Sequence, residues 1–462
     1  MIRVMLSDLA RALNGRLLGA DCAIDAVSTD TRTISAGALF VALRGARFDA
    51  HEFAAEAVAA GASALLVERE LALDCPQLVV ADSRIALGQL GALVMAAVAP
   101  KTVAVTGSAG KTTVKEMMAT ILAQAGQVLA TKGNFNNDIG VPLTLLRLTA
   151  ADHYAVMELG ANHRGEIAYT VDLVKPQAAI ITNAAAAHLE GFGDIAGVAR
   201  AKSEIFLGLP EDGVAIFPAD SQFSDFWTQR NQGHRIWTFA IDDSRATFHA
   251  REVVMGDDGC ARFTLCCPEG EATIALPLPG RHNIANALAA AAGTLALGVS
   301  LAQVASGLAA APAVAGRLNS YRLADDLLVI DDSYNANLQS VRAAIELLAG
   351  YGGQRLLVLG DMAELGDDAR RYHAEVGAYA AERGIDQLLT CGELSRTAAD
   401  AAAGRGCHFA DQAALIAELK QQLDARSGRL TILVKGSRSA RMEQVVNALR
   451  ASHGAQTEGA SC

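Results

Sequence analysis

The sequence predicts an α/β protein of about three domains. Its 462 residues are too many for one ordinary hydrophobic core. Short apolar segments recur along the chain, and polar or glycine-rich turns follow them. This alternation is typical of parallel sheets that are covered by helices. A glycine-rich turn at residues 106–113 lies between an apolar segment and a helical pattern, which indicates a phosphate-binding loop.

Residues 1–84 are expected to form a small α/β domain. The apolar runs at residues 39–43 and 64–67 have the length of strands, and residues 53–60 show a helical pattern. The next stretch, residues 85–313, carries further buried-type strands and ends in alanine-rich helices. Its expected strands lie at residues 103–105, 155–157 and 179–181.

A third α/β domain is expected at residues 314–462, because the arrangement of the second stretch is repeated there. Pro312 and Gly316 lie between the two patterns and mark the best candidate for a hinge. Ligands of such sheets bind beyond the carboxyl ends of the strands. The expected strands lie at residues 327–330, 356–359, 388–390 and 431–434.

The composition disfavours several classes of protein. The net charge of −11 argues against a nucleic-acid partner, because the phosphate backbone requires a basic face. The longest apolar stretch, residues 284–316, is interrupted by polar and glycine residues, so we expect no membrane span. The N-terminus lacks the features of a secretory signal, which predicts a cytoplasmic protein. The eight cysteines have no repeated short spacing, so neither a zinc site nor a disulfide framework is expected.

The loop at residues 106–113 is expected to bind a nucleoside triphosphate. The N–H groups of the turn and of the helix N-terminus attract anions, and Lys111 is placed to reach the terminal phosphates. The common pattern has a glycine where this chain has Val105, so the loop is a shorter-spaced variant. The two threonine hydroxyls after Lys111 are expected to reach a Mg²⁺ ion. The predicted nucleotide-binding residues of the loop are Gly107, Ser108, Ala109, Gly110, Lys111, Thr112 and Thr113.

A second loop, at residues 131–142, is dense in amide side chains and is closed by Gly140 and Pro142. Asparagine and glycine favour turns, so the segment is consistent with a simple connector. Three asparagines around an aromatic residue would equally suit a polar ligand that needs both donors and acceptors. The residue types alone leave both interpretations open.

Ionisable residues follow two other strands of the second domain. Glu158 ends one strand and His188 follows another, at the edge that carries the phosphate loop. Mg²⁺ prefers hard oxygen ligands, so Glu158 is a candidate ligand together with a threonine hydroxyl of that loop. A lone histidine in an alanine-rich loop is more often structural. Lys202, in a helical pattern, would by default be a solvated residue.

Three polar segments nearer the C-terminus have alternative interpretations. Residues 280–287 place polar side chains at the start of an alanine-rich helix, where they would cap it. Asp331 and Asp332 end a strand and would cap a turn. Residues 435–441 concentrate positive charge after a strand, which suits either a bound carboxylate or phosphate, or the balancing of local acidic groups.

Taken together, these motifs resemble the Mur ligase family, the ATP-dependent amide-forming enzymes of peptidoglycan precursor synthesis. The resemblance is greatest to the type that adds D-alanyl-D-alanine to UDP-N-acetylmuramoyl-tripeptide. The phosphate loop departs from the general pattern by its shorter spacing, and this family shows the same shorter spacing. The shared segments are residues 28–32, 48–51, 106–113, 133–142, 158–162, 188–193, 280–287, 331–337, 360–366 and 435–439.

The resemblance implies a central P-loop-type parallel-sheet ATPase at residues 85–313. It is flanked by a small α/β N-terminal domain, residues 1–84, that binds the UDP end of the substrate. A Rossmann-like C-terminal domain, residues 314–462, would close over the site. Where the family usually has proline after residues 335–337, this chain has Leu338, which questions the rigidity of that loop.

The resemblance also implies the cofactors and the roles of individual residues. ATP and two Mg²⁺ ions are expected, with Lys202 carbamylated and acting as a metal ligand; a carbamate replaces a repelled ammonium by oxygen ligands. The second ion would take His188. The implied catalytic residues are Lys111, Glu158, His188 and Lys202, and the implied metal ligands are Thr112, Thr113, Glu158, His188 and Lys202. Asn283 and Asn286 would meet adenine, and Arg317 and Asp332 would contact the nucleotide. The implied substrate-binding residues are Ser28, Thr29, Arg32, Asp49, His51, Asn134, Phe135, Asn137, Asn335, Asn337, Lys435 and Arg438.

The implied activity joins UDP-MurNAc-tripeptide to D-alanyl-D-alanine through an acyl phosphate, in a monomeric protein. A sister ligase that adds the third amino acid typically carries an Asp-Asn-Pro-Arg-type motif, and no Asp-Asn-Pro occurs here. Folylpolyglutamate synthetase shares the ATPase core but would not need the UDP-type segment at residues 28–51. A nucleotide-dependent switch would hydrolyse ATP with no response to an added amine.

Overall fold

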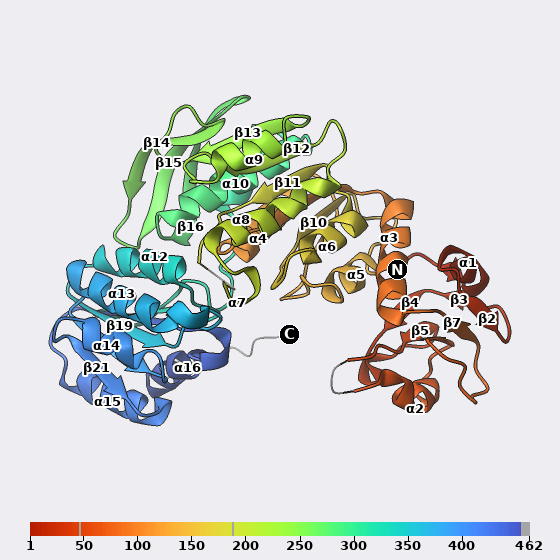
Figure 1. The fold of residues 1–462 in the computed structure, drawn as a ribbon. Helices are drawn as coiled ribbons and strands as arrows, with labels where there is room; N and C mark the ends of the chain where they lie inside the picture. Colours follow the sequence, from red (N-terminus) through yellow and green to blue (C-terminus); the bar gives the residue numbers. More distant parts are fainter. Residues whose placement is uncertain (46–47, 187–188, 454–462) are drawn as a thin grey trace.

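A computed structural model describes residues 1–45, 48–186 and 189–453 (Figure 1). The chain forms three lobes, each built around one larger sheet. In Figure 1 the N-terminal lobe (red) and the C-terminal lobe (blue) lie on opposite sides, and the central lobe lies above and between them. The α/β fold predicted from the sequence is confirmed. The predicted boundaries after residues 84 and 313 stay predictions.

The N-terminal lobe contains a five-stranded sheet in the order β2-β7-β6-β5-β4. The strands β4 to β7 pair in parallel, and only the edge strand β2 is antiparallel. The predicted strands and the predicted helix of this lobe are confirmed. The bounds are β1 (Val4–Met5), α1 (Leu6–Ala12), β2 (Arg16–Leu18), β3 (Ala23–Ile24), β4 (Ala26–Ser28), η1 (Thr31–Thr33), β5 (Ala38–Val41), η2 (Ala50–Phe53), α2 (Ala54–Ala59), β6 (Ala64–Val67) and β7 (Gln77–Val79).

Helix α3 (Ser83–Val98) connects the N-terminal lobe to the central lobe. Its start is capped by Asp82, whose carboxylate accepts two backbone N–H groups of the first turn. The helix packs against α5 (Gly140–Leu145) and α6 (Glu166–Val174) of the central lobe. Buried residues of the N-terminal sheet, of α3 and of these helices belong to one continuous apolar cluster. The two lobes therefore share part of their hydrophobic core.

The central lobe is built on a nine-stranded sheet in the order β16-β15-β14-β13-β12-β11-β8-β10-β9. The strands from β8 to β14 pair in parallel, as expected, but β15 pairs antiparallel with both of its neighbours, β14 and β16. The turns before β15 and β16 are too short to contain a crossover helix, so these strands must reverse direction. The bounds are β8 (Lys101–Thr106), β9 (Val128–Ala130), β10 (Tyr154–Glu158), β11 (Ala178–Ile181), β12 (Val214–Pro218), β13 (Arg235–Ala240), β14 (Phe248–Met255), β15 (Cys260–Cys267) and β16 (Gly270–Pro279).

Helices cover both faces of the parallel part of this sheet. Along β8, Ala104 packs into the cluster that contains α3 and α6, whereas Val103 and Val105 pack into the cluster that contains α4, α10 and α11. Such alternation is what a buried strand with two covered faces requires. The remaining helices of the lobe are α4 (Lys111–Leu122), α7 (Leu189–Phe192), α8 (Ile195–Ser203), η3 (Glu204–Gly208), α9 (Ser224–Arg230), α10 (His282–Ala296) and α11 (Leu301–Ala309).

The C-terminal lobe contains a six-stranded sheet in the order β17-β18-β22-β19-β20-β21, parallel except for β17. Helices α12 to α14 cover one face and α15 and α16 the other. The bounds are β17 (Asn319–Ala324), β18 (Leu327–Asp332), α12 (Leu338–Ala349), β19 (Gln354–Gly360), η4 (Gly366–Asp368), α13 (Ala369–Glu382), β20 (Gln387–Cys391), α14 (Arg396–Ala401), β21 (Gly406–Phe409), α15 (Gln412–Ala425), β22 (Leu430–Lys435), η5 (Arg438–Ala440) and α16 (Glu443–Ser452).

Leu338 is the first residue of α12. The preceding residue, Asn337, caps the helix together with Ser340, which returns a hydrogen bond to the backbone of Asn337. Proline is favoured at the first helical position because of its fixed φ, but a capped helix does not require it. The loop at residues 335–337 therefore ends at a well-defined point without the usual proline.

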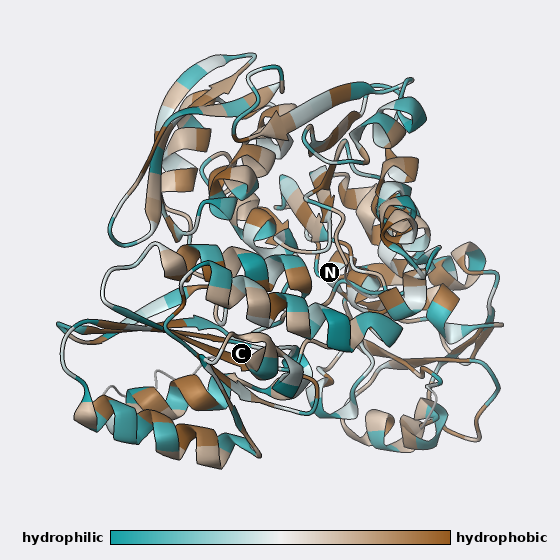
Figure 2. Cartoon of the chain, turned by 60° about the vertical axis from the view of Figure 1, so that its left-hand side comes forward, coloured by the Kyte–Doolittle hydropathy of each residue, from teal (hydrophilic) through white to brown (hydrophobic). Residues whose placement is uncertain are grey.

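Hydropathy follows this layered architecture. Figure 2 shows apolar and polar residues alternating along the outer helices, as expected for helices with one buried and one exposed face. Within the described part of the chain, no helix has both the length and the apolar character needed to cross a bilayer.

Candidate active site

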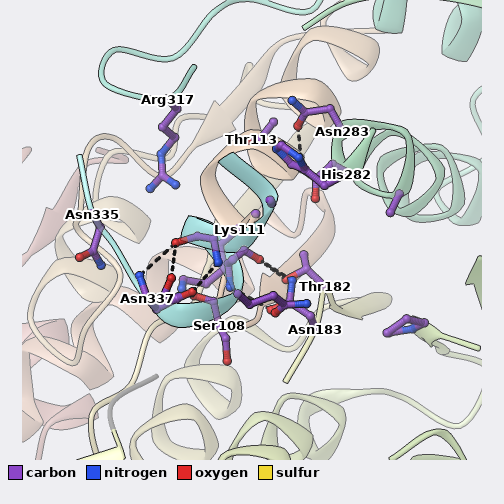
Figure 3. A pocket seen from close by; sticks show the side chains of 18 of the residues that line it. Ser108, Lys111, Thr113, Thr182, Asn183, His282, Asn283, Arg317, Asn335 and Asn337 are labelled. Carbon is purple, nitrogen blue, oxygen red and sulfur yellow. Dashed lines mark hydrogen bonds between the residues drawn. The ribbon is translucent and has the colours of Figure 1, made fainter. Parts of the chain in front are cut away.

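A pocket of about 680 Å³ lies between the central and C-terminal lobes. It is lined by the carboxyl ends of β8, β10 and β11 from one side and by residues after β18 from the other. Figure 3 shows Ser108 and Lys111 at its centre, with Asn335 and Asn337 on one side and Thr182 and Asn183 on the other. Its volume is in the range of small-molecule sites.

The phosphate loop leads from β8 into α4, as predicted. Gly107 and Gly110 have φ angles of 155° and 82°, which L-residues rarely adopt. A Cβ at Gly107 would lie 1.8 Å from Oγ1 of Thr182, and one at Gly110 would lie 2.5 Å from Oδ1 of Asn286. Both glycines are therefore required by backbone conformation and by space.

Two residues that the sequence analysis did not single out hold the phosphate loop in place. Thr182 donates its hydroxyl hydrogen to the carbonyl of Ala109 at 2.6 Å. The side chain of Asn183 accepts the N–H of Ala109 at 2.9 Å and donates to its carbonyl at 3.1 Å. Thr182 and Asn183 directly follow β11, which is the neighbour of β8. Their place at a strand end was the signal that could have identified them.

Lys111 begins α4 and lines the pocket. Its Nζ donates to the carbonyl of Gly107 at 2.7 Å, which holds the ammonium over the loop. Burial lowers the pKa of Lys111, while the carboxylate of Glu158 opposes this and Arg317 reinforces it. The ammonium thus lies over the phosphate loop, and its predicted contact with a terminal phosphate stays a prediction.

Glu158 ends β10 and is 2 % exposed. Its Oε2 accepts the hydroxyl hydrogen of Thr112 at 2.9 Å, and its Oε1 accepts the side-chain N–H of Asn136 at 2.8 Å. Asn136 belongs to the amide-rich loop but was not among the residues chosen from the sequence. A carboxylate and a hydroxyl next to a phosphate loop fit the oxygen preference of Mg²⁺. Among the described residues, no group of three or more His, Cys, Asp or Glu side chains is suited to hold a metal.

Lys202 lies at the end of α8 and is buried, not solvated as its helical pattern suggested by default. Its Nζ lies 5.6 Å from the ring centroid of Phe192, and the residue lines the pocket. Burial, reinforced by the Lys111 ammonium, lowers the pKa of Lys202 to about 7. The amine is therefore partly neutral at physiological pH. His188, the predicted ligand of the second ion, lies outside the described residues.

Two residues of the C-terminal lobe reach the phosphate loop directly. Arg317 donates through Nη2 to the hydroxyl of Thr112 at 3.0 Å, and its guanidinium lies 4.4 Å from the ring centroid of Tyr334. Asn337 donates through Nδ2 to the carbonyl of Ser108 at 3.4 Å. The predicted closure of this lobe over the phosphate loop is consistent with these contacts.

Asp332 and Lys435 form a buried ion pair at the wall of the pocket. Their strands β18 and β22 are neighbours, and the two residues are paired in register. The Nζ of Lys435 lies 2.5 Å from Oδ2 of Asp332 and also donates to the carbonyl of Asn335 at 3.0 Å. Burial raises the pKa of Asp332, and the ammonium of Lys435 opposes the rise. Lys435 thereby fixes both the acid and the loop that follows β18.

Three polar residues begin α10 at the other end of the pocket. Asn283 donates to the carbonyl of Pro279 at 2.7 Å, and Asn286 donates to Oδ1 of Asn283 at 2.8 Å. The side chains of Asn283 and Asn286 therefore support each other as well as lining the pocket. Figure 3 shows His282 beside Asn283.

His282 is expected to stay neutral well below pH 6.5. Burial, together with the charge of Lys435, lowers the pKa of His282 to about 4. The unfolded chain would take up this proton at a higher pH than the folded chain does. Stability should therefore fall as the pH drops from about 6.5 towards 4. An NMR titration of ¹³C-labelled histidines checks this, and a transition for His282 near pH 6.5 would contradict it.

Three domain descriptions of one family match the chain. The Mur ligase family catalytic domain matches residues 23–124, the Mur ligase middle domain residues 105–294, and the Mur ligase glutamate ligase domain residues 316–438. The chain belongs to the Mur ligase family. The match extends over all three lobes, so the resemblance seen in the sequence motifs is confirmed.

Relatives of this Mur ligase are similar over nearly their whole length. The UDP-N-acetylmuramoyl-tripeptide–D-alanyl-D-alanine ligase of Escherichia coli (strain K12) is 54% identical over 450 residues, which are 97% of this chain and 99% of the relative. The crystal structure of MurF from Acinetobacter baumannii is 40% identical with a TM-score of 0.92, over 96% of this chain and 98% of that chain. MurF ligase from Thermotoga maritima in complex with ADP is 25% identical with a TM-score of 0.82, over 93% and 98% of the two chains.

The N-terminal lobe of this Mur ligase carries the residues predicted to bind the UDP end. His51 accepts the N–H of Glu68 through Nε2 at 2.8 Å, and its Nδ1 lies 2.5 Å from the carboxylate of Asp49. Arg32 pairs with Asp30 at 2.6 Å and is exposed. Ser28 is the last residue of β4, and Thr29 comes directly after it at the same edge of the sheet. These residues gather at the carboxyl edge of the parallel strands and do not line the pocket.

The amide-rich loop of this Mur ligase presents its residues in different directions. Asn137 accepts the N–H of Gly140 at 2.8 Å and so helps to start α5. Asn134 and Phe135 are exposed, the latter by 48%. Arg438, another of the predicted substrate-binding residues, is also exposed and pairs with Glu443 at 3.1 Å. The roles of these residues in substrate binding stay predictions.

Proposed function

We propose that this Mur ligase joins D-alanyl-D-alanine to UDP-N-acetylmuramoyl-tripeptide at the expense of ATP, giving the UDP-MurNAc-pentapeptide. The observation that carries the proposal is the pocket between two lobes, where a phosphate loop, Lys111 and Glu158 meet Arg317 from the C-terminal lobe. The similarity over 97% of the chain to a ligase named for this reaction supports the same function.

The reaction proceeds in two steps. The terminal carboxylate of the tripeptide attacks the γ-phosphorus of ATP, so that an acyl phosphate forms and ADP leaves. The free amine of D-alanyl-D-alanine then attacks the acyl carbon, the bond to phosphate breaks, and the amine gives up a proton. Without the first step the leaving group would be oxide, so the carboxylate would not react.

The protein contributes mainly positioning and charge neutralisation. Lys111 neutralises charge on the transferred phosphoryl group, and the N–H groups of the phosphate loop orient it. Arg317 adds a second cation from the C-terminal lobe. Contacts between the lobes exclude water, which would otherwise hydrolyse the acyl phosphate.

We assign the metal ligands as follows. Glu158 with the hydroxyls of Thr112 and Thr113 would hold one Mg²⁺ ion, and a carbamylated Lys202 with His188 would hold the second. The hydrogen bond of 2.9 Å between Thr112 and Glu158 and the lowered pKa of Lys202 support this assignment. Bound Mg²⁺ would neutralise the phosphate oxygens of ATP.

The substrate contacts are proposed by lobe. The N-terminal lobe would bind the UDP end, the residues that begin α10 would meet adenine, and the C-terminal lobe would bind the nucleotide and the dipeptide. We further propose a cytoplasmic enzyme, since ATP and UDP-linked precursors are intracellular substrates. We also propose that it is a monomer. The residues proposed are Ser28, Thr29, Arg32, Asp49 and His51 for the UDP end, Asn134, Phe135 and Asn137 for the substrate in general, Asn283 and Asn286 for adenine, Arg317 and Asp332 for the nucleotide, and Asn335, Asn337, Lys435 and Arg438 for the dipeptide.

Phosphate release from ATP tests the proposal. With UDP-MurNAc-tripeptide present, addition of D-alanyl-D-alanine should raise phosphate release severalfold, and mass spectrometry should detect the joined pentapeptide. A nucleotide-dependent switch would release phosphate at the same rate with or without the dipeptide. Phosphate release without any pentapeptide would therefore refute the ligase assignment.

A further inference from the structure

Lys115 is a buried cation that no step of the proposed reaction uses. It lies one turn after Lys111 on α4, is 1% exposed and does not line the pocket. Burial of an ammonium is costly unless its donors are paired. Its Nζ donates to the carbonyl of Thr131 at 2.7 Å and lies 2.6 Å from the carboxylate of Glu116, which is itself partly exposed.

Thr131 connects this lysine to the site. The residue is 1% exposed and directly follows β9, where the amide-rich loop begins. Its hydroxyl accepts the backbone N–H of Glu158 at 2.9 Å, and its own N–H donates to the carbonyl of Val156 at 3.0 Å. The position of Glu158 on its strand is thus fixed by the side chain of the residue whose carbonyl Lys115 holds.

The amide-rich loop that begins at Thr131 also contacts the Glu158 segment at a second point. Five residues after Thr131, Asn136 donates its side-chain N–H to Oε1 of Glu158, and its carbonyl accepts the N–H of Gly160 at 2.8 Å. A shift at the start of the loop would therefore disturb both the backbone and the carboxylate of Glu158. Of the three side chains that hold Glu158 in this way, those of Lys115, Thr131 and Asn136, only that of Lys115 is charged.

We propose that Lys115 is a positioning residue, which acts through Thr131 to hold the carboxylate of Glu158 in the orientation that binds Mg²⁺. This inference rests on the proposed metal role of Glu158. Groups that orient a metal ligand from behind typically change metal affinity by about 10–100-fold when they are removed. A lysine that served only to fill the interior would affect stability without affecting Mg²⁺.

The test is calorimetric titration of ADP into the full-length protein, with Mg²⁺ and with EDTA. The variant Lys115→Met keeps the length of the side chain but removes the donor. In the wild type, Mg²⁺ should increase the affinity for ADP. In the variant this increase should shrink by about tenfold or more, while the affinity measured in EDTA stays within about twofold of the wild type.

Lys101→Met is the matched control. Lys101 also donates from Nζ to a backbone carbonyl, that of Leu297 at 3.0 Å, but it lies at the opposite end of β8. This variant should lose some thermal stability and keep the full effect of Mg²⁺. If Lys115→Met does not fold, Thr131→Val decides, because it removes the acceptor for the N–H of Glu158 and should cause the same Mg²⁺-specific loss.

The outcomes separate two kinds of failure. A wild-type protein whose affinity for ADP does not respond to Mg²⁺ would refute the metal role of Glu158 and with it the role of Lys115. A wild-type response that Lys115→Met or Thr131→Val retains in full would overturn the positioning role alone. In that case the proposed ligase activity would be unaffected.

Discussion

Replacing Lys111 with alanine is expected to lower kcat for pentapeptide formation by at least about a thousandfold. A single cation that stabilises a phosphoryl-transfer transition state contributes about 10³–10⁵ to the rate. Lys111 is held over the phosphate loop through its bond to Gly107, and the alanine variant leaves the loop without this charge. The measurement is the rate of phosphate release together with mass spectrometry of the product.

Lys420→Ala provides the control, because Lys420 is an exposed lysine of α15 in another lobe. It should keep full activity. Thermal unfolding of both variants should show that the loss in Lys111→Ala does not result from unfolding. If Lys111→Ala forms pentapeptide at the wild-type rate, Lys111 has no part in the mechanism.

The positions of the central residues could be predicted from the sequence where these residues lie close together along the chain. The phosphate loop needs only a strand, a glycine-rich turn and a helix in succession, so Gly107 to Thr113 could be identified locally. Glu158 could be placed at the same edge because the carboxyl ends of parallel strands lie together. Both predictions depended on short-range patterns and on one general rule of sheets.

Contacts between distant segments could not be predicted in this way. Asp332 and Lys435 are paired because β22, the last strand, inserts beside β18, the second strand of its sheet. No local pattern reveals this insertion, so the sequence left open whether Lys435 binds a ligand or balances a local acid, and only the fold shows its pairing with Asp332. Likewise, Asn136 was passed over in favour of its neighbours, since only the folded loop shows which asparagine faces Glu158.

The burial of Lys202 differs most from what the local sequence pattern predicts. In α8, Val198 and Ala201 pack into a cluster that includes residues of the C-terminal lobe, so the helix is covered by a second lobe. A helical pattern alone describes a helix with one exposed face. The family resemblance, not the pattern, pointed to a special role for this lysine.

Lys202→Ala is expected to lower kcat by about a hundredfold or more. Loss of a group that only orients a metal ligand costs about 10–100-fold, and Lys202 is proposed to be a ligand itself. In the proposed role, the carbamate supplies oxygen to the second Mg²⁺. Short carboxylates such as formate or acetate should then restore part of the activity, because they supply similar oxygens to the space left by the side chain. Lys202→Arg keeps a positive charge but cannot form a carbamate, so it should be inactive and should not be rescued.

The carbamate itself can be observed independently of activity. Carbon dioxide reacts with the neutral amine, and the pKa of about 7 for Lys202 means that the neutral fraction rises as the pH increases through 7. In ¹³C-bicarbonate, the wild type should therefore show a carbamate NMR signal that grows from pH 6 to pH 8. The signal should be absent from Lys202→Ala. Equal signals in the two proteins would exclude a carbamate at this position, and full activity of Lys202→Ala would exclude a catalytic role for it.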